Sequence, residues 1–343
     1  MYDYVIVGAG SAGCVLAGRL SENPAVSVLL LEAGPPDTAD QIHIPAAVNL
    51  LFGSTYDWGF RTVPQDRAGG QSVYWPRGRV IGGSSSINAM IYIRGNKLDY
   101  NTWRDEYGCD GWGYNDLLPY FLRSEHNSRG PSPYHGGSGP LWVSDPSYKS
   151  ASTSAFVEAA VGAGAPANPD FNGPEQDGVG FYQVTQKEGR RYSAADAYLH
   201  PAVGRPNLTV RTDALATSVL IEAGRAVGVR YLHRGTEQVA RAEAEVIVCG
   251  GAVNSPQLLM LSGIGPADHL REHGISVAAD SPGVGANLSD HPVVPAIWRT
   301  PKMPALWEKA GPKNLFRWQL RHSGPFTSNV AESGGFSRTR PSL

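Results

Sequence analysis

Residues 2–13 have the sequence YDYVIVGAGSAG. The first six alternate and are rich in β-branched and aromatic side chains, which is typical of a strand, and the next six match the pattern G-x-G-x-x-G. Residues 14–21 carry apolar side chains at helical spacing, and residues 26–31 (VSVLLL) form an apolar run typical of a strand buried on both faces of a parallel sheet. These segments predict a compact β-α-β unit with a glycine-rich turn at the start of its helix.

The glycine turn has the chemistry of a diphosphate site. Gly8 permits a tight turn, Gly10 lets backbone N–H groups approach a pyrophosphate, and Gly13 lets the helix pack closely against the strand. The helix N-terminus, where Ser11 and Ala12 lie, adds partial positive charge. The sequence therefore predicts that the phosphates of a dinucleotide bind at this turn.

A single acidic residue ends the second strand of this unit. Glu32 follows Gly13 by 19 residues, where a carboxylate can accept a hydrogen bond from a ribose 2′-OH and repel a 2′-phosphate. NADP is thus disfavoured, while NAD and FAD both fit. No second glycine fingerprint is found, since residues 283–288 (GVGANL) lack the third glycine. Together with the strands expected within residues 207–232, this favours a single FAD; a plain glycine turn beside a surface glutamate is the alternative.

Composition limits the class of protein. The chain has 343 residues, which suggests about two domains. It carries 29 basic and 31 acidic residues, which excludes a basic nucleic-acid footprint. The hydrophobic content of 41% is enough for a sizeable core, and the three cysteines are too few for a disulfide framework. No signal peptide or apolar run of membrane-spanning length is visible, so we expect no transmembrane segment and a cytoplasmic location.

A second glycine-rich segment follows at residues 79–90, with the sequence RVIGGSSSINAM. Its glycines and serines have small side chains, and the serine hydroxyls and the backbone N–H groups are hydrogen-bond donors. A flat ring could therefore lie against this segment. Asn88 and the backbone of Ala89 and Met90 would then bond the polar edge of the ring. A simple serine-rich loop is the alternative.

These motifs together resemble the glucose–methanol–choline (GMC) oxidoreductases, and most of all the choline and alcohol dehydrogenases. Residues 78–88 are similar to the first signature of the family and residues 251–265 (GAVNSPQLLMLSGIG) to the second. Residues 284–291 (VGANLSDH) look like a further family segment. The resemblance spans residues 4–291.

The resemblance implies a bound FAD and the oxidation of an alcohol CH–OH group by hydride transfer to flavin N5. It places Ala33 beside Glu32 and the backbone of Ala216 at the ADP half, and it adds Asp290 to the cofactor-binding residues. At the ring half it places Val80, Gly83, Asn88, Ala89, Met90 and Ile91. Relatives with covalent FAD carry a histidine at the position of Ile87, so we expect non-covalent FAD.

The fold class predicted is α/β: a Rossmann-like FAD/NAD(P)-binding domain with an inserted β-meander, plus an incomplete α+β substrate domain. We expect a discontinuous FAD-binding domain at residues 1–125 and 190–291. Residues 126–189 and 292–343 would form the substrate or cap domain.

One feature of the family has no counterpart in the sequence. The family's catalytic base is a histidine in an H-P-x-G-T-like segment, and none of the nine histidines lies in one. His291 precedes a proline but belongs to the 284–291 segment. We therefore assign no catalytic residue, expect the base to lie beyond Leu343, and interpret the chain as a fragment.

Three other functions stay open. The chain could be a GMC-type lyase with a structural FAD, or a flavoprotein without catalysis. A serine hydrolase is the third, because residues 135–139 (HGGSG) look like an oxyanion-hole loop, although no G-x-S-x-G elbow exists. We expect a small-molecule alcohol substrate, with O₂ or a quinone-type carrier as electron acceptor.

Overall fold

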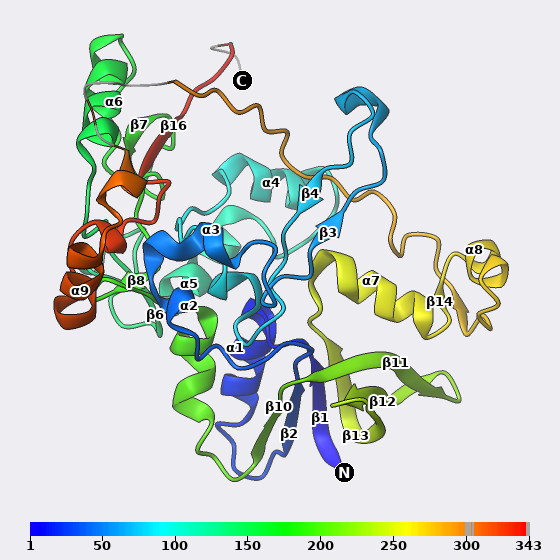
Figure 1. Cartoon of the computed structure of the whole chain (residues 1–343). Helices are drawn as coiled ribbons and strands as arrows, with labels where there is room; N and C mark the ends of the chain where they lie inside the picture. The colour runs from blue at the N-terminus through cyan, green and yellow to red at the C-terminus, as the bar shows by residue number, and fades with distance from the viewer. Residues whose placement is uncertain (299–302, 304, 341–343) are drawn as a thin grey trace. The chain divides into compact units, whose positions relative to one another are not determined.

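The computed structural model describes residues 1–298, 303 and 305–340 (Figure 1). Two compact units are present. Unit 1 comprises residues 1–38, 51–87 and 193–297, and unit 2 comprises residues 39–50, 88–192 and 298–343. The predicted domain division also has two discontinuous parts, but it places residues 39–50, 88–125 and 190–192 with the FAD domain and residues 292–297 with the cap domain. Because compactness does not assign function, the predicted division stays a prediction.

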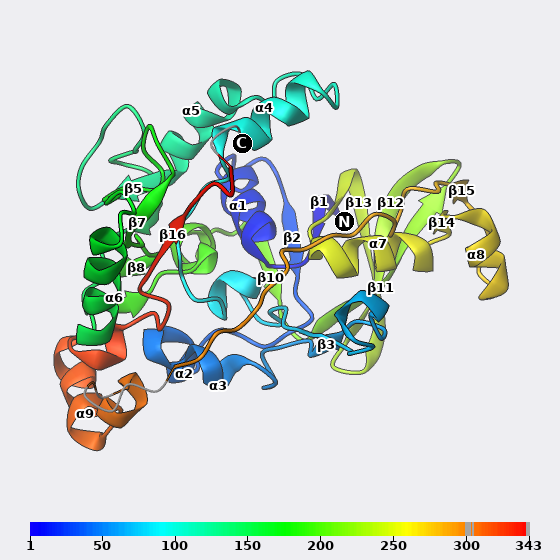
Figure 2. The same cartoon turned by 90° about the horizontal axis from the view of Figure 1, so that it is seen from above.

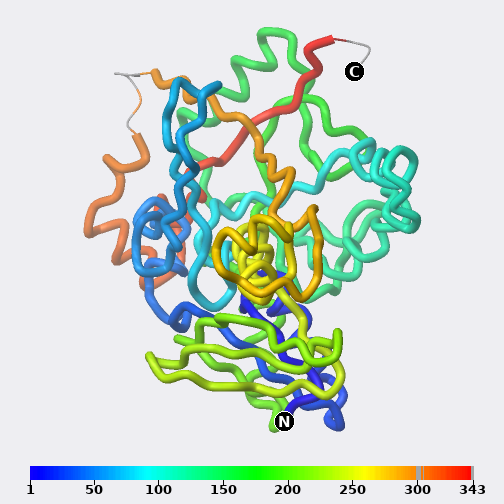
Figure 3. Tube along the Cα trace, turned by 90° about the vertical axis from the view of Figure 1, so that its right-hand side faces the viewer, coloured from blue at the N-terminus to red at the C-terminus, as the bar shows by residue number. Residues whose placement is uncertain are grey.

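Unit 1 is built on a six-stranded sheet with the order β10-β2-β1-β13-β12-β11, and Figure 3 shows its meander strands in yellow-green in the lower part of the picture. Four strands, β10, β2, β1 and β13, pair in parallel, and β11, β12 and β13 form an antiparallel meander. The strands are β1 (Tyr2–Val7), β2 (Val28–Leu31), β10 (Leu208–Arg211), β11 (Ala214–Glu222), β12 (Arg225–His233) and β13 (Thr236–Val248). The predicted β-α-β unit and inserted meander are confirmed.

Strand β13 joins the two parts of this sheet. Its first half pairs antiparallel with β12, from Thr236 opposite His233, and its second half pairs in parallel with β1, up to Val248 opposite Val7. Only residues 246–249 of this segment form an apolar run that a local pattern assigns to a strand. Within residues 236–245 only Ala240 and Ala242 are buried and the other side chains are exposed, so this half lacks the apolar run of a buried strand.

The core of unit 1 lies on both faces of the parallel strands. On one face Ile6, Val28 and Leu30 pack with helix α1, and on the other Val5, Leu29 and residues of the meander pack together. Side chains of a strand alternate between its faces, so strands covered on both sides must be apolar throughout. All four residues of β2 are accordingly buried.

Helix α1 (Ser11–Leu20) begins inside the glycine motif, three residues before the predicted start. Gly13 is therefore a helical residue, and a Cβ on it would lie 1.9 Å from the carbonyl oxygen of Gly8. This distance leaves room only for glycine and gives the close helix–strand approach that the third glycine predicts. Figures 1 and 2 show α1 lying along the β1–β2 part of the sheet.

The remaining elements of unit 1 are short apart from α7. The α-helices and strands among them are β3 (Phe60–Arg61), β4 (Tyr74–Trp75), α7 (Gly251–Leu261), β14 (Ile264–Gly265), α8 (Ala267–Glu272) and β15 (Ala279–Asp280). Helix α7 contains Pro256 beyond its first turn. Proline favours the first turn of a helix, but here five helical residues precede it.

Unit 2 is a mixture of helices and two-stranded sheets. Figure 2 shows α6 beside β7 and β16, which pair antiparallel. Its elements are α2 (Asp40–His43), α3 (Val48–Leu51, whose last residue belongs to unit 1), α4 (Lys97–Asp105), α5 (Tyr114–Ser124), β5 (Glu125–Asn127), β6 (Leu141–Val143), α6 (Ala151–Gly162), β7 (Gly178–Phe181), β8 (Gln186–Lys187), β9 (Arg190–Arg191), α9 (Pro312–Arg321) and β16 (Ser333–Phe336).

Two stretches whose sequence shows little helical periodicity contain helices. Residues 100–150 hold most of α4 and all of α5, and residues 292–343 hold α9. Glycine, proline and aromatic residues around these helices hide the helical period, and α5 itself contains Pro119. Among the helices of the described residues, none has the length and apolar character needed to cross a bilayer.

Candidate functional site

Unit 1 contains a cavity of about 950 Å³ at the carboxyl ends of β1, β2 and β13. The start of α1, the first residues of β11 and the first turns of α7 complete its wall. In open parallel sheets, ligands bind outside the carboxyl ends of the strands. The volume lies at the upper end of the range of about 300–1,000 Å³ that is usual for ligand pockets. The cavity therefore has both the position and the size for a dinucleotide half.

Most of the sequence-predicted ADP-binding residues share this cavity. Its lining includes Gly8, Gly10, Ser11, Ala12, Glu32, Ala33 and Ala216, together with Gly83, which the sequence placed at the ring half. Gly13 does not line it, because it is buried on the side of α1 that packs against the carbonyl of Gly8, and Val80 does not, because it is fully buried. The prediction that Val80 contacts a cofactor thus has no support from this cavity.

The two glycine motifs of unit 1 meet at this cavity. Gly82 donates its N–H to the carbonyl oxygen of Ala9 over 2.8 Å. A Cβ on Gly83 would lie 2.6 Å from the Cα of Gly10, and Gly83 has a φ of +54°. Both the close approach and the left-handed backbone require glycine here. The sequence assigned the motifs separate tasks and did not indicate that one supports the other.

The side chain of Glu32 is hydrogen-bonded to the backbone of the glycine turn. One carboxylate oxygen accepts a hydrogen bond from the N–H of Ala9 over 2.8 Å, and the other accepts one from Gly34 over 2.9 Å. The side chain is almost fully buried, and this burial raises the pKa of Glu32 to about 7. Glu32 lines the cavity, both of its oxygens also anchor backbone, and its predicted hydrogen bond with a ribose stays a prediction.

The cavity has lining residues that the sequence did not single out. Arg77 is the one cationic side chain among the described lining residues. Trp58 and Phe60 stack on one another with their ring centres 5.8 Å apart. Asn254 of α7 also lines the cavity, and its Oδ1 is buried without a hydrogen-bond partner. Arg77 immediately precedes the first family signature, which was the signal that could have found it.

Asp290 lies outside the lining of the cavity, in an exposed position. Its carboxylate accepts a hydrogen bond from the indole N–H of Trp75 over 2.7 Å and lies 3.6 Å from the guanidinium of Arg77. The ring of Trp75 stacks under that guanidinium, 3.9 Å away. Asp290 therefore orients Arg77, and its predicted direct contact with a cofactor stays a prediction.

The remaining predicted ring residues, Asn88 to Ile91, belong to unit 2. Asn88 is exposed, Ala89 and Ile91 are half-buried, and Met90 is buried. Met90 has a φ of +59°, which is uncommon for a residue with a side chain. Ile91 forms an isolated bridge with Val184. The backbone of this segment therefore has an unusual conformation at Met90, and the polar side chain of Asn88 is exposed.

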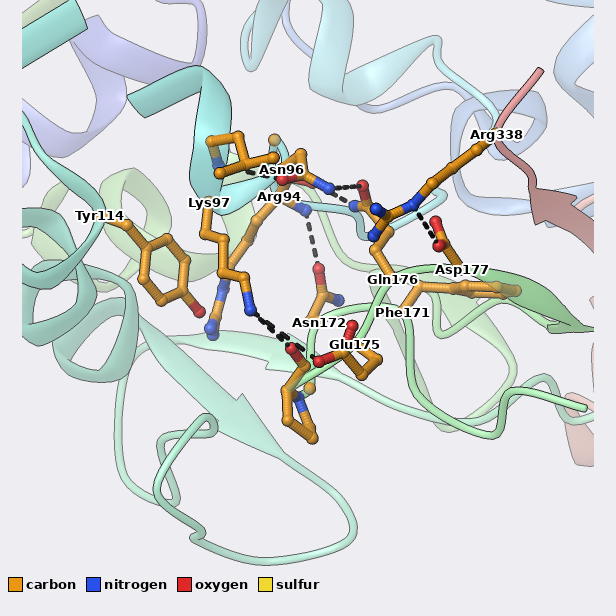
Figure 4. A pocket seen from close by; sticks show the side chains of 14 residues that line it. Arg94, Asn96, Lys97, Tyr114, Phe171, Asn172, Glu175, Gln176, Asp177 and Arg338 are labelled. Atoms are coloured by element: carbon orange, nitrogen blue, oxygen red, sulfur yellow. Dashed lines mark hydrogen bonds and ion pairs between the residues drawn. The ribbon is translucent and has the colours of Figure 1, made fainter. Parts of the chain in front are cut away.

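Unit 2 has a second, much smaller cavity of about 50 Å³ beside the start of α4 (Figure 4). Figure 4 shows Arg94, Lys97 and Tyr114 along one wall and Asp177 with Arg338 on the other side. The cationic side chains have acidic partners: Arg94 pairs with Glu125 over 2.8 Å and Arg338 with Asp177 over 2.6 Å. This space is too small for a dinucleotide or a flavin ring.

The loop at residues 135–139 does not have the geometry of an oxyanion hole. The N–H groups of Gly136 and Gly139 donate to Glu125, one to its side chain and one to its carbonyl. Both ring nitrogens of His135 bond carboxylates, with Nδ1 2.9 Å from Glu125 and Nε2 2.9 Å from Asp170. Donors that are already paired cannot stabilise a developing oxyanion, so the hydrolase interpretation is not supported.

A comparison with protein families identifies the fold that carries the unit 1 cavity. The model of the GMC oxidoreductase family matches residues 2–293. The chain belongs to the GMC oxidoreductase family. This confirms the predicted family and, with it, the predicted Rossmann-like α/β fold class of the FAD-binding kind.

Individual GMC relatives agree with this assignment. The chain is 49% identical to an alcohol dehydrogenase [acceptor] of Pseudomonas putida, over 99% of this chain and 63% of the relative. It is 46% identical to the mitochondrial choline dehydrogenase of Homo sapiens, over 100% of this chain and 59% of the relative. The chain therefore spans about three fifths of the length of these curated GMC relatives.

Solved GMC structures are similar as well. Formate oxidase from Aspergillus oryzae matches with a TM-score of 0.89 and 32% identity, covering 98% of this chain and 61% of that one. Pyridoxine 4-oxidase from Mesorbium loti matches with a TM-score of 0.79 and 40% identity, covering 82% and 56%. A structure from Chaetomium thermophilum, described as an FAD-dependent oxidoreductase, has a TM-score of 0.86 at 31% identity over 97% and 61%.

Proposed function

We propose that this chain binds FAD non-covalently and serves the oxidation of an alcohol CH–OH group. The observation that carries the proposal is the cavity of unit 1, where eight sequence-predicted residues line one space at the carboxyl ends of parallel strands. The ADP half of FAD would occupy this cavity. The family membership supports the choice of FAD, and the names of the alcohol and choline dehydrogenase relatives support the choice of substrate class.

The residues of the cavity fit the ADP half of a dinucleotide. The N-terminus of α1, with Gly10, Ser11 and Ala12, presents backbone N–H groups and a partial positive charge for the diphosphate. Arg77 adds a full positive charge. The buried Oδ1 of Asn254 needs a donor, which an adenine amino group or a ribose hydroxyl can supply. Ala216 offers backbone at the start of the meander.

The ring half of FAD would lie against Asn88, Ala89, Met90 and Ile91. Asn88 follows the cavity-lining Gly83 by five residues, so the chain connects the two predicted contacts directly. Ile87 precedes Asn88 and has no group that could form a covalent bond to a flavin. Bound FAD would supply the acceptor for a hydride from the carbinol carbon. The electron acceptor that reoxidises it would be O₂ or a quinone-type carrier, and the compartment would be the cytoplasm.

No catalytic base is assigned to this chain. His135 and His200 each lie between two carboxylates, and the hydrogen bonds that their rings donate to these carboxylates raise the pKa of His135 to about 9 and the pKa of His200 to about 10. A histidine that stays protonated at neutral pH is a poor acceptor for a hydroxyl proton. We propose, by the family resemblance, that the base is a histidine outside residues 1–343.

Uptake of flavin by the purified chain tests the proposal. The protein is incubated with FAD, freed of unbound ligand by gel filtration, and its visible absorbance is recorded. We expect bound FAD that trichloroacetic acid releases into the supernatant, as non-covalent binding requires. A folded protein that retains no flavin would refute the proposal.

A second measurement separates the oxidoreductase from the lyase and the non-catalytic flavoprotein. Choline and simple primary alcohols are added anaerobically to the flavin-loaded protein. Bleaching of the flavin absorbance by an alcohol indicates hydride transfer. Retained FAD without bleaching, together with activity in a chain extended to the length of the relatives, would place the missing base in the added residues.

A further inference from the structure

The side-chain amide of Asn88 is held in one orientation by two donors. The Nη1 of Arg191 lies 2.9 Å from the Oδ1 of Asn88, and the backbone N–H of Met90 lies 3.0 Å from the same oxygen. A guanidinium and a backbone N–H can only donate hydrogen bonds. The atom between them must therefore be the amide oxygen, so the NH₂ group of Asn88 is at the other end.

Arg191 is itself fixed. Its side chain is almost fully buried, and its Nε donates to the carbonyl oxygen of Ile42 over 2.8 Å. A buried guanidinium keeps its charge at any accessible pH and has little freedom to move. Asn88, in contrast, is exposed. The buried, charged side chain of Arg191 thus fixes the exposed side chain of Asn88, whose NH₂ group is a hydrogen-bond donor.

The backbone next to Asn88 is also held from two directions. Asn329 donates from its Nδ2 to the carbonyl oxygen of Ala89 over 3.0 Å, and Thr185 donates its N–H to the carbonyl oxygen of Met90 over 2.8 Å. Met90 is buried with a φ of +59°. Such a backbone persists only where its surroundings fix it, and it is typical of functional sites.

We propose that Arg191 is a positioning residue that locks the amide of Asn88 so that only its NH₂ group faces the flavin. The inference rests on the proposed function and deepens it. Asn88 donates one hydrogen bond to the polar edge of the ring, and that bond strengthens when the ring gains negative charge. Arg191 makes no contact with the ring and acts through Asn88.

Sulfite is the probe, because it adds to flavin N5 and leaves a negative charge on the ring system. The full chain is loaded with FAD and titrated with sulfite, and the bleaching of the visible band gives a Kd. Variants R191M and N88A both remove the locked donor. We expect each to raise the sulfite Kd about tenfold, as for the loss of one hydrogen bond. The double variant should show no further increase, because both changes remove the same donor.

Two further variants serve as controls. R190M removes the neighbouring arginine, which lies over the ring of Trp318, and should keep the wild-type sulfite Kd. R191K keeps one donor toward Asn88 and should give an intermediate Kd. If R191M does not fold, N88D at the exposed position carries the test, because a carboxylate offers no donor and should raise the Kd at least as much as N88A.

The outcomes separate the inference from the function on which it rests. Wild-type protein without flavin overturns both. Wild-type protein with flavin, and a sulfite Kd in R191M, R191K or N88D equal to that of the wild type, overturns the inference alone. A lower melting temperature in R191M with an unchanged sulfite Kd would show a purely structural arginine and likewise refute the proposal.

Discussion

The buried carboxylate of Glu32 accepts the N–H of Ala9 over 2.8 Å, which ties the end of β2 to the glycine turn after β1. The second oxygen accepts the N–H of Gly34. These two bonds favour the ionised carboxylate, but burial outweighs them and raises the pKa of Glu32 to about 7. The glycine turn is therefore hydrogen-bonded to a carboxyl group, that of Glu32, whose charge changes near neutral pH.

This raised pKa predicts a pH dependence of stability. Between the ordinary pKa of 4.5 and the folded value of about 7, the folded chain binds more protons than the unfolded chain. The stabilisation is complete below pH 4.5 and is lost as the pH rises to 7. Relative to E32Q, we expect the wild-type free energy of unfolding to fall by on the order of 3 kcal/mol across this window. Urea unfolding at several pH values measures it; a constant difference between the two proteins would contradict the prediction.

The buried strands of the parallel part of the sheet could be predicted from the sequence because their side chains are buried on both faces. Every position of β2 is buried, so the apolar run VLLL is unambiguous. Strand β13 could not be predicted in full, because it changes from a mostly exposed strand of the meander to a partly buried parallel strand along its length. Its first half carries Glu and small alanines, which local patterns do not assign to a strand.

The candidate site likewise contains residues that the sequence could predict and residues that it could not. The glycine motif and Glu32 were found because their chemistry needs fixed residue types at fixed spacing. Arg77, Trp58 and Asn254 were missed, since each enters the cavity from a separate segment and only the tertiary fold brings them together. The support of Asn88 by Arg191 spans 103 residues of sequence and has no local signal.

Arg77 should contribute to the affinity for FAD through charge. It is the cationic side chain among the described lining residues of the unit 1 cavity, and Trp75 and Asp290 orient it. We expect R77Q to raise the Kd for FAD about tenfold at low salt and to weaken the dependence of the Kd on salt concentration. R61Q is the matched control, because Arg61 lies on the nearby β3 but does not line the cavity. Equal Kd values for R77Q and R61Q in a fluorescence titration would refute this role.

Gly83 should tolerate no side chain. An added Cβ would lie 2.6 Å from the Cα of Gly10, where neither backbone can yield without moving the glycine turn. We expect G83A to lower the free energy of unfolding by about 1–3 kcal/mol and to weaken FAD binding by at least tenfold. G69A provides the comparison, since Gly69 has a similar φ of +67° with nothing within 4 Å of the added atom. It should cost only backbone strain and leave FAD binding intact. A G83A protein that binds FAD like G69A would show that the two motifs are independent.

Glu125 should be the most costly polar side chain to alter in unit 2. It is fully buried and accepts hydrogen bonds from Arg94 over 2.8 Å, from Asn127 and His135 over 2.9 Å, and from the N–H of Gly136 over 3.1 Å. E125Q leaves Arg94 buried without its counter-charge, and we expect a loss of about 3–5 kcal/mol in the free energy of unfolding. D145N, which breaks the exposed pair between Asp145 and Arg129, should cost less than about 1 kcal/mol.

The E125Q substitution should also lower the pKa of His135. Hydrogen bonds to Asp170 and Glu125 raise the pKa of His135 from 6.5 to about 9, so its stabilising charge is present below pH 6.5 and is lost as the pH rises through 9. In E125Q one of these partners is neutral, and the pKa should fall toward its ordinary value. Imidazole resonances followed by NMR across this range give the pKa directly. An unchanged pKa in a folded E125Q protein would mean that Asp170 alone holds the charge on His135.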